Sequence, residues 1–398
     1  MLRCTRFGIG ENGGGALQSR PTQSTAFTIG VVALLLIAAS PERIVPRPGT
    51  NSSVTPRRAA RKATPRAYPG FGYQTTAGQG FPTYTVTSLA AVGAGTFSDA
   101  LGGARRSGGG IIKFRVSGGI APAASLTVPA NTTVDGTTAP GGGITIWGGY
   151  TGRGGGTLQV WYSNVIIRGL RIRNSANDGI QVAPKGAGVD ISRIVIDHCS
   201  VTNSADGGID TTGYQGHRLS DITLIGNYIA GSGRRCSKGR CGGGTLFKYG
   251  ATNGSFYYNF YDKVLERTPA ISGEGSTGPV IVDIRYNVVG NTYGKSSMQV
   301  YTGAFGNVVG NYFMHPPQDA IHAALWDGHV FLVGNTDPDL PAGGNAPEQA
   351  VPFPPHPMAK ADIVADAGAR PRDAIDGCYI SRAQSWADIK AGLVCPAP

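Results

Sequence analysis

The run ITLIGNYIAG (222–231) decides the fold, because close counterparts of it recur on both sides. Upstream stand VIIRGLRIRN (165–174) and IVIDHCSVTN (194–203), and downstream stand SFYYNFYDKV (255–264), VDIRYNVVGN (282–291), NVVGNYFMHP (307–316) and HVFLVGN (329–335). Aligned on a polar turn position, they place in one column Gly169, His198, Asn227, Asn259, Asn287, Asn311 and Asn335. The column repeats every 24 to 32 residues, and a period in this range indicates a solenoid.

The repeated runs are short, apolar and rich in β-branched residues, which excludes a helical repeat. We therefore predict an all-β fold, a right-handed parallel β-helix in which each turn pairs its backbone with the turns on either side. The aligned asparagines should stack and hydrogen-bond along the axis. Composition agrees with this fold. The 62 glycines suit its tight bends, and charged residues make up only 15% of the chain, which excludes a helical bundle or coiled coil.

Most of the positive charge lies near the N-terminus. The net charge is +11, of which residues 1–69 supply +8. A nucleic-acid-binding domain would concentrate this charge in its folded part, so no nucleic-acid partner is expected.

The first 69 residues differ in character from the rest. The stretch AFTIGVVALLLIAA (26–39) follows three arginines and precedes small residues. It is short for a membrane span but typical of the apolar part of a signal peptide. We predict a signal peptide or membrane anchor over 1–40, a disordered Pro/Arg-rich linker over 41–69, and a β-helix domain with a C-terminal tail over 70–398. We expect a secreted, extracellular protein, with a periplasmic or a cell-surface-anchored location as the alternatives.

Four of the six cysteines form two close pairs in the sequence, Cys236 with Cys241 and Cys378 with Cys395. Export makes both pairs candidate disulfides, although sequence alone does not fix their connectivity. Cys199 lies within a β-rich run and is expected to be a small buried hydrophobic residue.

Ionisable residues recur at nearly one position on different coils. Asp178, Asp206 and Arg267 follow their aligned turn positions by eight or nine residues, and Asp210 stands four residues after Asp206. Coils stack about 4.8 Å apart, so these side chains should line one groove. Carboxylates without histidines or thiols favour a hard cation such as Ca²⁺. The alternative is that aspartates in glycine-rich turns only accept backbone hydrogen bonds.

Several segments resemble the pectate lyases of the polysaccharide lyase family 1 type, in that family's order from about residue 70 to 385. These are GFGYQTTAGQG (70–80), IIKFRVSGGI (111–120), IDHCSVTNSADGGID (196–210), YYNFYDKVLERTP (257–269) and VADAGARPRDAID (364–376). The resemblance implies Ca²⁺-dependent β-elimination of α-1,4-linked polygalacturonate, the de-esterified form of pectin.

Residue by residue, the resemblance makes Asp178, Asp206 and Asp210 calcium ligands and Arg267 the base. Two departures from the family pattern concern cationic residues. The second arginine that usually follows the RxP element is missing from RTPAISGEG (267–275), and Lys248 is displaced from the family's lysine position. We take Lys248 and Arg235, the latter in the basic loop around Cys236, as candidate substrate-binding residues. A solvated basic loop is the alternative for Arg235.

The expected partner is an acidic polysaccharide bound by a monomer, with no membrane contact apart from the N-terminal anchor. Two other readings stay open beside the lyase: an inactive β-helix protein that binds uronans at a surface, and a lyase for another uronic-acid polymer. A β-helix glycoside hydrolase would need paired carboxylates as acid and base. The chain lacks the adjacent aspartates and Gly-His-Gly turn that resemblance to polygalacturonases would require.

Overall fold

The computed structural model describes residues 68–149, 155–185, 188–233, 242–293, 296–315, 319–321, 327–336, 343–381 and 395. The predicted signal peptide or anchor and almost all of the predicted linker lie outside these residues, as do Arg235 and the Cys236–Cys241 pair. No helix in the described ranges is both long enough and apolar enough to cross a membrane.

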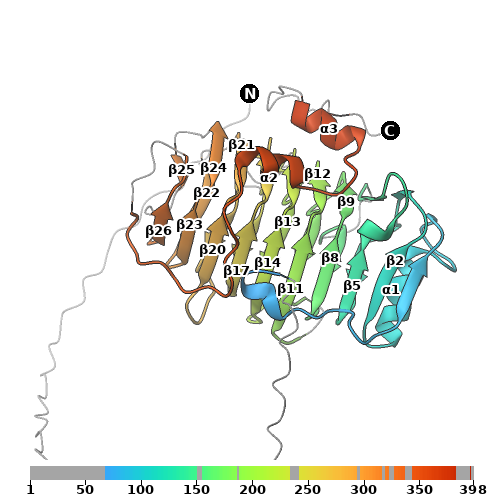
Figure 1. Ribbon diagram of the computed structural model, residues 1–398. Helices are drawn as coiled ribbons and strands as arrows, with labels where there is room; N and C mark the ends of the chain where they lie inside the picture. Colours follow the sequence, from blue (N-terminus) through green and yellow to red (C-terminus); the bar gives the residue numbers. More distant parts are fainter. Residues whose placement is uncertain are drawn as a thin grey trace, which may run out of the picture. The chain divides into compact units, whose positions relative to one another are not determined.

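Three parallel sheets run along the solenoid, and every coil contributes one strand to each (Figure 1). Sheet A consists of β1 (Thr83–Val86), β2 (Gly110–Phe114), β5 (Thr132–Asp135), β8 (Val165–Arg168), β11 (Ile191–Asp197), β14 (Leu219–Ile225), β17 (Ala251–Tyr257), β20 (Ile281–Arg285), β23 (Phe305–Val309) and β26 (His329–Val333). Sheet B consists of β3 (Gly118–Ile120), β6 (Ile144–Trp147), β9 (Leu170–Arg173), β12 (Ser200–Thr202), β15 (Tyr228–Ala230), β18 (Phe260–Asp262), β21 (Val288–Asn291) and β24 (Tyr312–His315). Sheet C consists of β4 (Leu126–Val128), β7 (Leu158–Val160), β10 (Ile180–Val182), β13 (Ile209–Thr212), β16 (Leu246–Lys248), β19 (Ala270–Ser272), β22 (Ser296–Tyr301) and β25 (Asp319–Ile321).

The right-handed parallel β-helix predicted from the repeats is confirmed. Residues alternate between the interior and the outer face along each strand, as β geometry requires. On β10, for example, Ile180 and Val182 are completely buried in the core, whereas Gln181 between them is on the outer face. Equivalent residues stack from coil to coil, so one core runs the length of the solenoid.

The predicted asparagine ladder is confirmed over five coils, from Asn227 to Asn335. Each side-chain amide donates to the next asparagine's Oδ1, at 2.9 Å from Asn227 to Asn259 and from Asn287 to Asn311, and at 3.0 Å at the two other steps. The same Oδ1 atoms also accept the backbone N–H of the preceding asparagine. Because these groups are buried, the ladder satisfies polar atoms that water cannot reach.

The prediction that His198 and Gly169 continue the ladder is wrong by one residue. The backbone N–H of Cys199 donates to Asn227 Oδ1 at 2.9 Å, so Cys199 occupies the ladder position. His198 stands one residue earlier, in the left-handed region with φ 45°, and its ring bonds Asp197 and Asp366 instead. Cys199 itself is buried and unpaired, as predicted.

Replacing Asn287 by alanine should lower the free energy of unfolding by about 3 kcal/mol, because buried donors and acceptors of two neighbouring coils lose their partners. Asn287 is completely buried and bonds Asn259, Asn311 and the carbonyl of Phe256. Chemical denaturation measures the change. Gln74→Ala, which removes an exposed amide, is the control and should change stability by less than about 0.5 kcal/mol.

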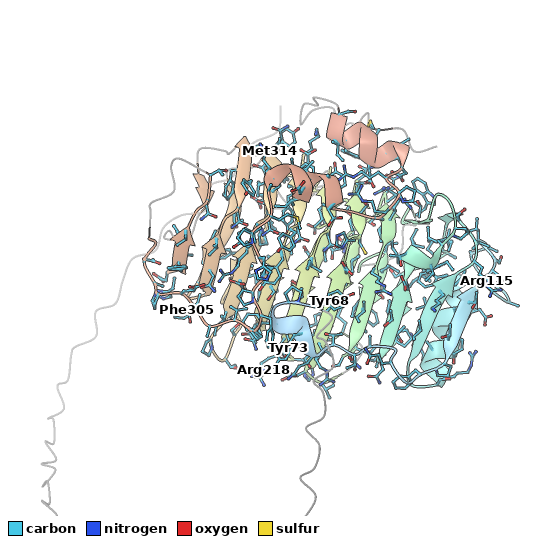
Figure 2. All side chains as sticks on the ribbon, in the orientation of Figure 1. Tyr68, Tyr73, Arg115, Arg218, Phe305 and Met314 are labelled. Carbon is cyan, nitrogen blue, oxygen red and sulfur yellow. A yellow bond between two sulfur atoms is a disulfide. The ribbon has the colours of Figure 1, made fainter. Side chains whose placement is uncertain are left out.

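Helix α1 (Phe97–Arg106) packs against β2 at the N-terminal end of the solenoid (Figure 1). Its side chain Phe97 joins the common core, so the helix protects core residues of the first coils from water. The segment leading to the short 3₁₀ helix η1 (Phe71–Gln74) lies on the outer face of sheet A, where the Tyr68 hydroxyl donates to Asp197 Oδ2 at 3.0 Å (Figure 2). A second 3₁₀ turn, η2 (Gly136–Thr138), follows β5.

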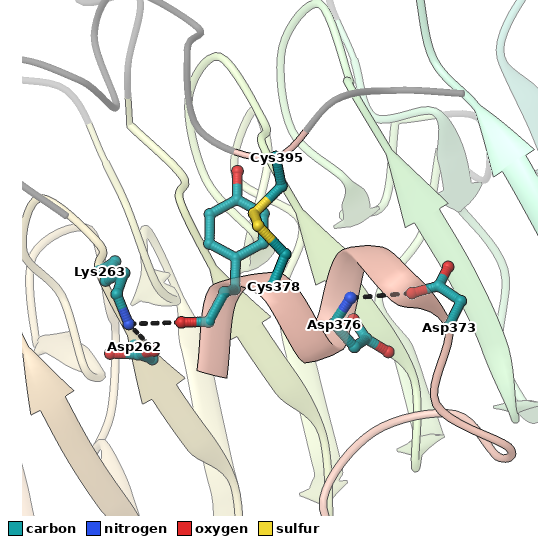
Figure 3. Close-up of a disulfide and its surroundings, with 7 residues drawn as sticks. Asp262, Lys263, Asp373, Asp376, Cys378 and Cys395 are labelled. Carbon is teal, nitrogen blue, oxygen red and sulfur yellow. Dashed lines mark hydrogen bonds and ion pairs between the residues drawn. A yellow bond between two sulfur atoms is a disulfide. The ribbon is translucent and has the colours of Figure 1, made fainter. Parts of the chain in front are cut away.

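The C-terminal segment covers sheet B with α2 (Lys360–Asp366) and α3 (Ala374–Ser381). Arg173 of β9, itself buried, pairs with Asp376 at 2.8 Å and with Asp373 at 3.1 Å. Figure 3 shows the predicted Cys378–Cys395 disulfide beside α3, and Lys263 donating to the backbone carbonyl of Tyr379 at 2.6 Å. Sheet B is thereby occupied by the chain itself.

Candidate active site

The four predicted site residues lie on one side of the solenoid, where sheet B turns into sheet C. Asp178 precedes β10, Asp206 and Asp210 flank the start of β13, and Arg267 precedes β19. These turns hydrogen-bond across neighbouring coils, with the Asp206 N–H donating to Asn177 O at 3.2 Å. Residues nearly 90 positions apart in sequence thus belong to one surface.

The three carboxylates are held by the same device. In each, Oδ1 accepts a backbone N–H from the following coil: Gly207 to Asp178 at 3.1 Å, Gly242 to Asp206 at 2.8 Å, and Leu246 to Asp210 at 2.9 Å. Each hydrogen bond fixes one oxygen and leaves the other to face a ligand. The turn-forming alternative from the sequence therefore describes half of each carboxylate.

The carboxylates are close enough to repel one another. Burial first, and then the negative charge of Asp206, raise the pKa of Asp178 to about 6. Burial and the charge of Asp178 raise the pKa of Asp210 well above its usual range, with Arg267 opposing the shift. The side chain of Asp210 also lies against Gly207, whose N–H binds Asp178. A cluster with surplus buried negative charge favours a cation.

Arg267 reaches back over two coils toward this cluster. Its Nη1 and Asp206 Oδ1 each lie 2.8 Å from the point that a Cβ on Gly242 would occupy, so the two atoms are within about twice that distance of each other. The Arg267 carbonyl accepts the Thr245 N–H at 2.7 Å, which fixes the backbone. Its nearest acidic side chain on the same coil, Glu266, is 3.9 Å away. The side chain is 18% exposed, so it can meet a ligand.

Lys248 lies on the outer face of the same sheet, but it is already paired. Its Nζ contacts Glu274 at 2.6 Å and lies 4.6 Å from the ring centroid of Tyr249. Uronate binding by Lys248 would require it to leave Glu274. Arg235 lies outside the described residues, and its role stays a prediction.

One polar residue of this surface was not predicted. Gln181 is the register partner of Asp210, and its amide donates to Asp178 Oδ2 at 2.9 Å. Its own Oε1 is buried and has no partner among the described residues. The signal in the sequence is a polar residue between two buried ones in GIQVA (179–183), which marks an outward position.

The donor set fits a hard cation such as Ca²⁺, which prefers carboxylate and amide oxygens. Asp178, Asp206 and Asp210 supply the charge, and the unpartnered Oε1 of Gln181 is a further oxygen beside them. As the side chains stand, no group of three or more acidic, histidine or cysteine residues within the described ranges converges closely enough to hold a metal. Binding would therefore require these side chains to close around the ion.

Replacing Gly242 by alanine should lower activity without changing stability much. The added methyl group would lie 2.8 Å from both Arg267 Nη1 and Asp206 Oδ1, and only side-chain ends have to move. We expect a tenfold or greater loss of turnover, since small displacements of reacting groups are costly. Gly278→Ala is the control, because a Cβ there meets nothing within 4 Å. Full activity of Gly242→Ala would show that the spacing of these two groups is unimportant.

The comparisons with known proteins agree with this architecture. Residues 156–337 match the family model described as "Right handed beta helix region". The chain is 28% identical over 299 residues to a probable pectate lyase C of Aspergillus terreus, covering 71% of this chain and 62% of that protein. It is 27% identical over 363 residues to a probable pectate lyase C of Aspergillus fumigatus, covering 82% and 77%.

Solved structures show the same fold. A pectate lyase bound to a hexasaccharide superposes with a TM-score of 0.52 at 14% identity, covering 76% of this chain and 96% of that one. A pectate lyase of Bacillus sp. N165 in complex with trigalacturonate gives a TM-score of 0.51 at 16% identity, covering 75% and 98%. From its coils, its matched family model and its relatives, the chain is a right-handed β-helix protein related to the pectate lyases.

Proposed function

We propose that this protein is an exported, monomeric polysaccharide lyase that cleaves α-1,4-linked polygalacturonate by Ca²⁺-dependent β-elimination. The observation that carries the proposal is the meeting of Asp178, Asp206 and Asp210 with Arg267 on one surface. The relatives named pectate lyase support the substrate class. The Cys378–Cys395 disulfide supports export, since such bonds persist in oxidising compartments.

In this proposal the three aspartates would hold the cation, with Gln181 beside them. When bound, Ca²⁺ would draw negative charge from the uronate carboxylate and so make the C5 proton more acidic. The backbone N–H bonds from Gly207, Gly242 and Leu246 keep the aspartates in place throughout.

Arg267 would take the C5 proton. The electron pair of the C5–H bond forms the C4–C5 double bond, the C4–O glycosidic bond breaks, and the departing oxygen is protonated by water. Guanidinium groups are ordinarily protonated at neutral pH. The site can use one as a base only when the surrounding carboxylate charge is compensated, which couples the two halves of the site.

Assay of the purified protein on polygalacturonate tests the proposal. The reaction should need Ca²⁺, stop with chelator, and give a product with the ultraviolet absorbance of an unsaturated uronate. Reducing ends without that absorbance would indicate hydrolysis instead. Binding without either product would indicate an inactive uronan-binding protein, and activity on a different uronic-acid polymer alone would change the substrate.

A further inference from the structure

Lys185 and Tyr214 occupy equivalent places on neighbouring coils, at the edge of sheet C. Val182 of β10 pairs with Thr211 of β13, and each of the two residues stands three positions further along its coil. The Lys185 Nζ lies 5.2 Å from the centroid of the Tyr214 ring, which is the geometry of a cation–π contact. This pair begins on the coils that carry Asp178 and Asp210, so it borders the carboxylate cluster.

The ring is fixed and open to solvent. The Tyr214 N–H donates to His217 O at 3.0 Å, and the His217 N–H donates back to Tyr214 O at 2.9 Å. The side chain remains 36% exposed. A rigid aromatic ring with a free face is a surface on which the apolar side of a sugar can pack.

Lys185 differs from Lys248, which forms the same kind of contact with Tyr249 on the next coil. Lys248 is neutralised by Glu274 at 2.6 Å. Lys185 has no carboxylate within ion-pair distance among the described residues, and only the Tyr214 ring faces its charge. Its charge nevertheless acts on Asp178, where it opposes the rise in that residue's pKa. Lys185 is therefore an uncommitted cation at the border of the carboxylate cluster.

We propose that Lys185 and Tyr214 form a second sugar-binding subsite, in which Lys185 binds the free carboxylate of a uronate and the Tyr214 ring supports that sugar. This inference rests on the proposed substrate class and extends it, because Lys185 takes over the role predicted for Lys248. An ammonium group selects a carboxylate over its methyl ester. The subsite thus discriminates against methyl-esterified substrate at this position.

Binding of trigalacturonate and of its methyl ester, measured by titration calorimetry in the presence of chelator, tests the subsite without turnover. Lys185→Gln should weaken trigalacturonate binding about tenfold, as expected for loss of one charge-assisted contact. It should leave the ester's weaker binding unchanged, and Lys185→Arg should restore binding to within about twofold. Lys113→Gln, an equal charge change on the exposed face of β2, is the control and should have no effect.

Unchanged trigalacturonate binding by Lys185→Gln would overturn the inference, as would an equal loss for both ligands or no binding by the unmodified protein. The two proposals fail separately. If the protein yields no unsaturated product but Lys185 still discriminates between acid and ester, the lyase proposal falls and the subsite stands.

Discussion

Arg267→Ala should reduce turnover of polygalacturonate at least a thousandfold, within the range that general-base catalysis supplies. The variant should remain folded. The side chain makes only a loose ion pair at 3.9 Å, and the hydrogen bond that fixes this coil is formed by the Arg267 carbonyl, which alanine retains. One cost is expected at the backbone, where φ is 65° in either variant.

Initial rates from product absorbance, with thermal unfolding of the same samples, separate lost chemistry from lost folding. Arg218→Ala is the matched control, because Arg218 forms an exposed ion pair with Asp190 far from the site (Figure 2). Turnover by Arg267→Ala within tenfold of the unmodified protein would remove this residue from the mechanism.

Asp210→Asn should abolish activity while making the calcium-free protein more stable. Asp210 is buried beside Asp178 and is repelled by it. Asparagine keeps an oxygen that can accept the Leu246 N–H but removes the charge. The unmodified protein should gain several degrees in Tm on adding Ca²⁺, since a ligand of the folded state stabilises it. Asp210→Asn should lose most of that gain.

The same repulsion predicts a pH dependence of stability without calcium. The pKa of Asp178 is raised from 3.8 to about 6 in the folded protein. The folded state therefore binds more protons than the unfolded state between these values, and stability falls as pH rises from about 4 to 6. Thermal unfolding across this range, with and without Ca²⁺, measures it. Stability that rises through the window, or a calcium effect retained by Asp210→Asn, would contradict this account of the cluster.

The sequence was sufficient for the coils that carry asparagines, because one residue type at one spacing identifies them. His198 misled the alignment because it is polar and stands near the right place. Matching the apolar residues instead, Ile194 with Ile222 and Ile196 with Leu224, puts His198 opposite Gly226 and Cys199 opposite Asn227, as the structure does. Burial pattern is thus a better guide to register here than polarity.

Other parts of the fold left little signal in the sequence. Sheet C strands such as β10 are three residues long, too short to show alternation, and they lie among glycine-rich turns. The coils before Val165 lack the asparagine. The buried Arg171 and Arg173 in LRIR (170–173) resemble ordinary surface residues until the C-terminal segment packs on them.

Within the site, coil phase alone was enough to place the aspartates and Arg267 on one surface. It could not show that Lys248 is paired with Glu274, because Glu274 belongs to the next coil. Nor could it find Lys185, whose partner Tyr214 is 29 residues away. Contacts between side chains of different coils depend on turn conformations that no local pattern specifies.

A crystal structure of Arg267→Lys with Ca²⁺ and trigalacturonate tests the central claim most directly. We predict a calcium ion 2.3–2.6 Å from carboxylate oxygens of Asp178, Asp206 and Asp210, with a uronate carboxylate on the ion and that sugar's C5 directed at residue 267. Calcium bound elsewhere, or a sugar chain on another face of the solenoid, would contradict the account.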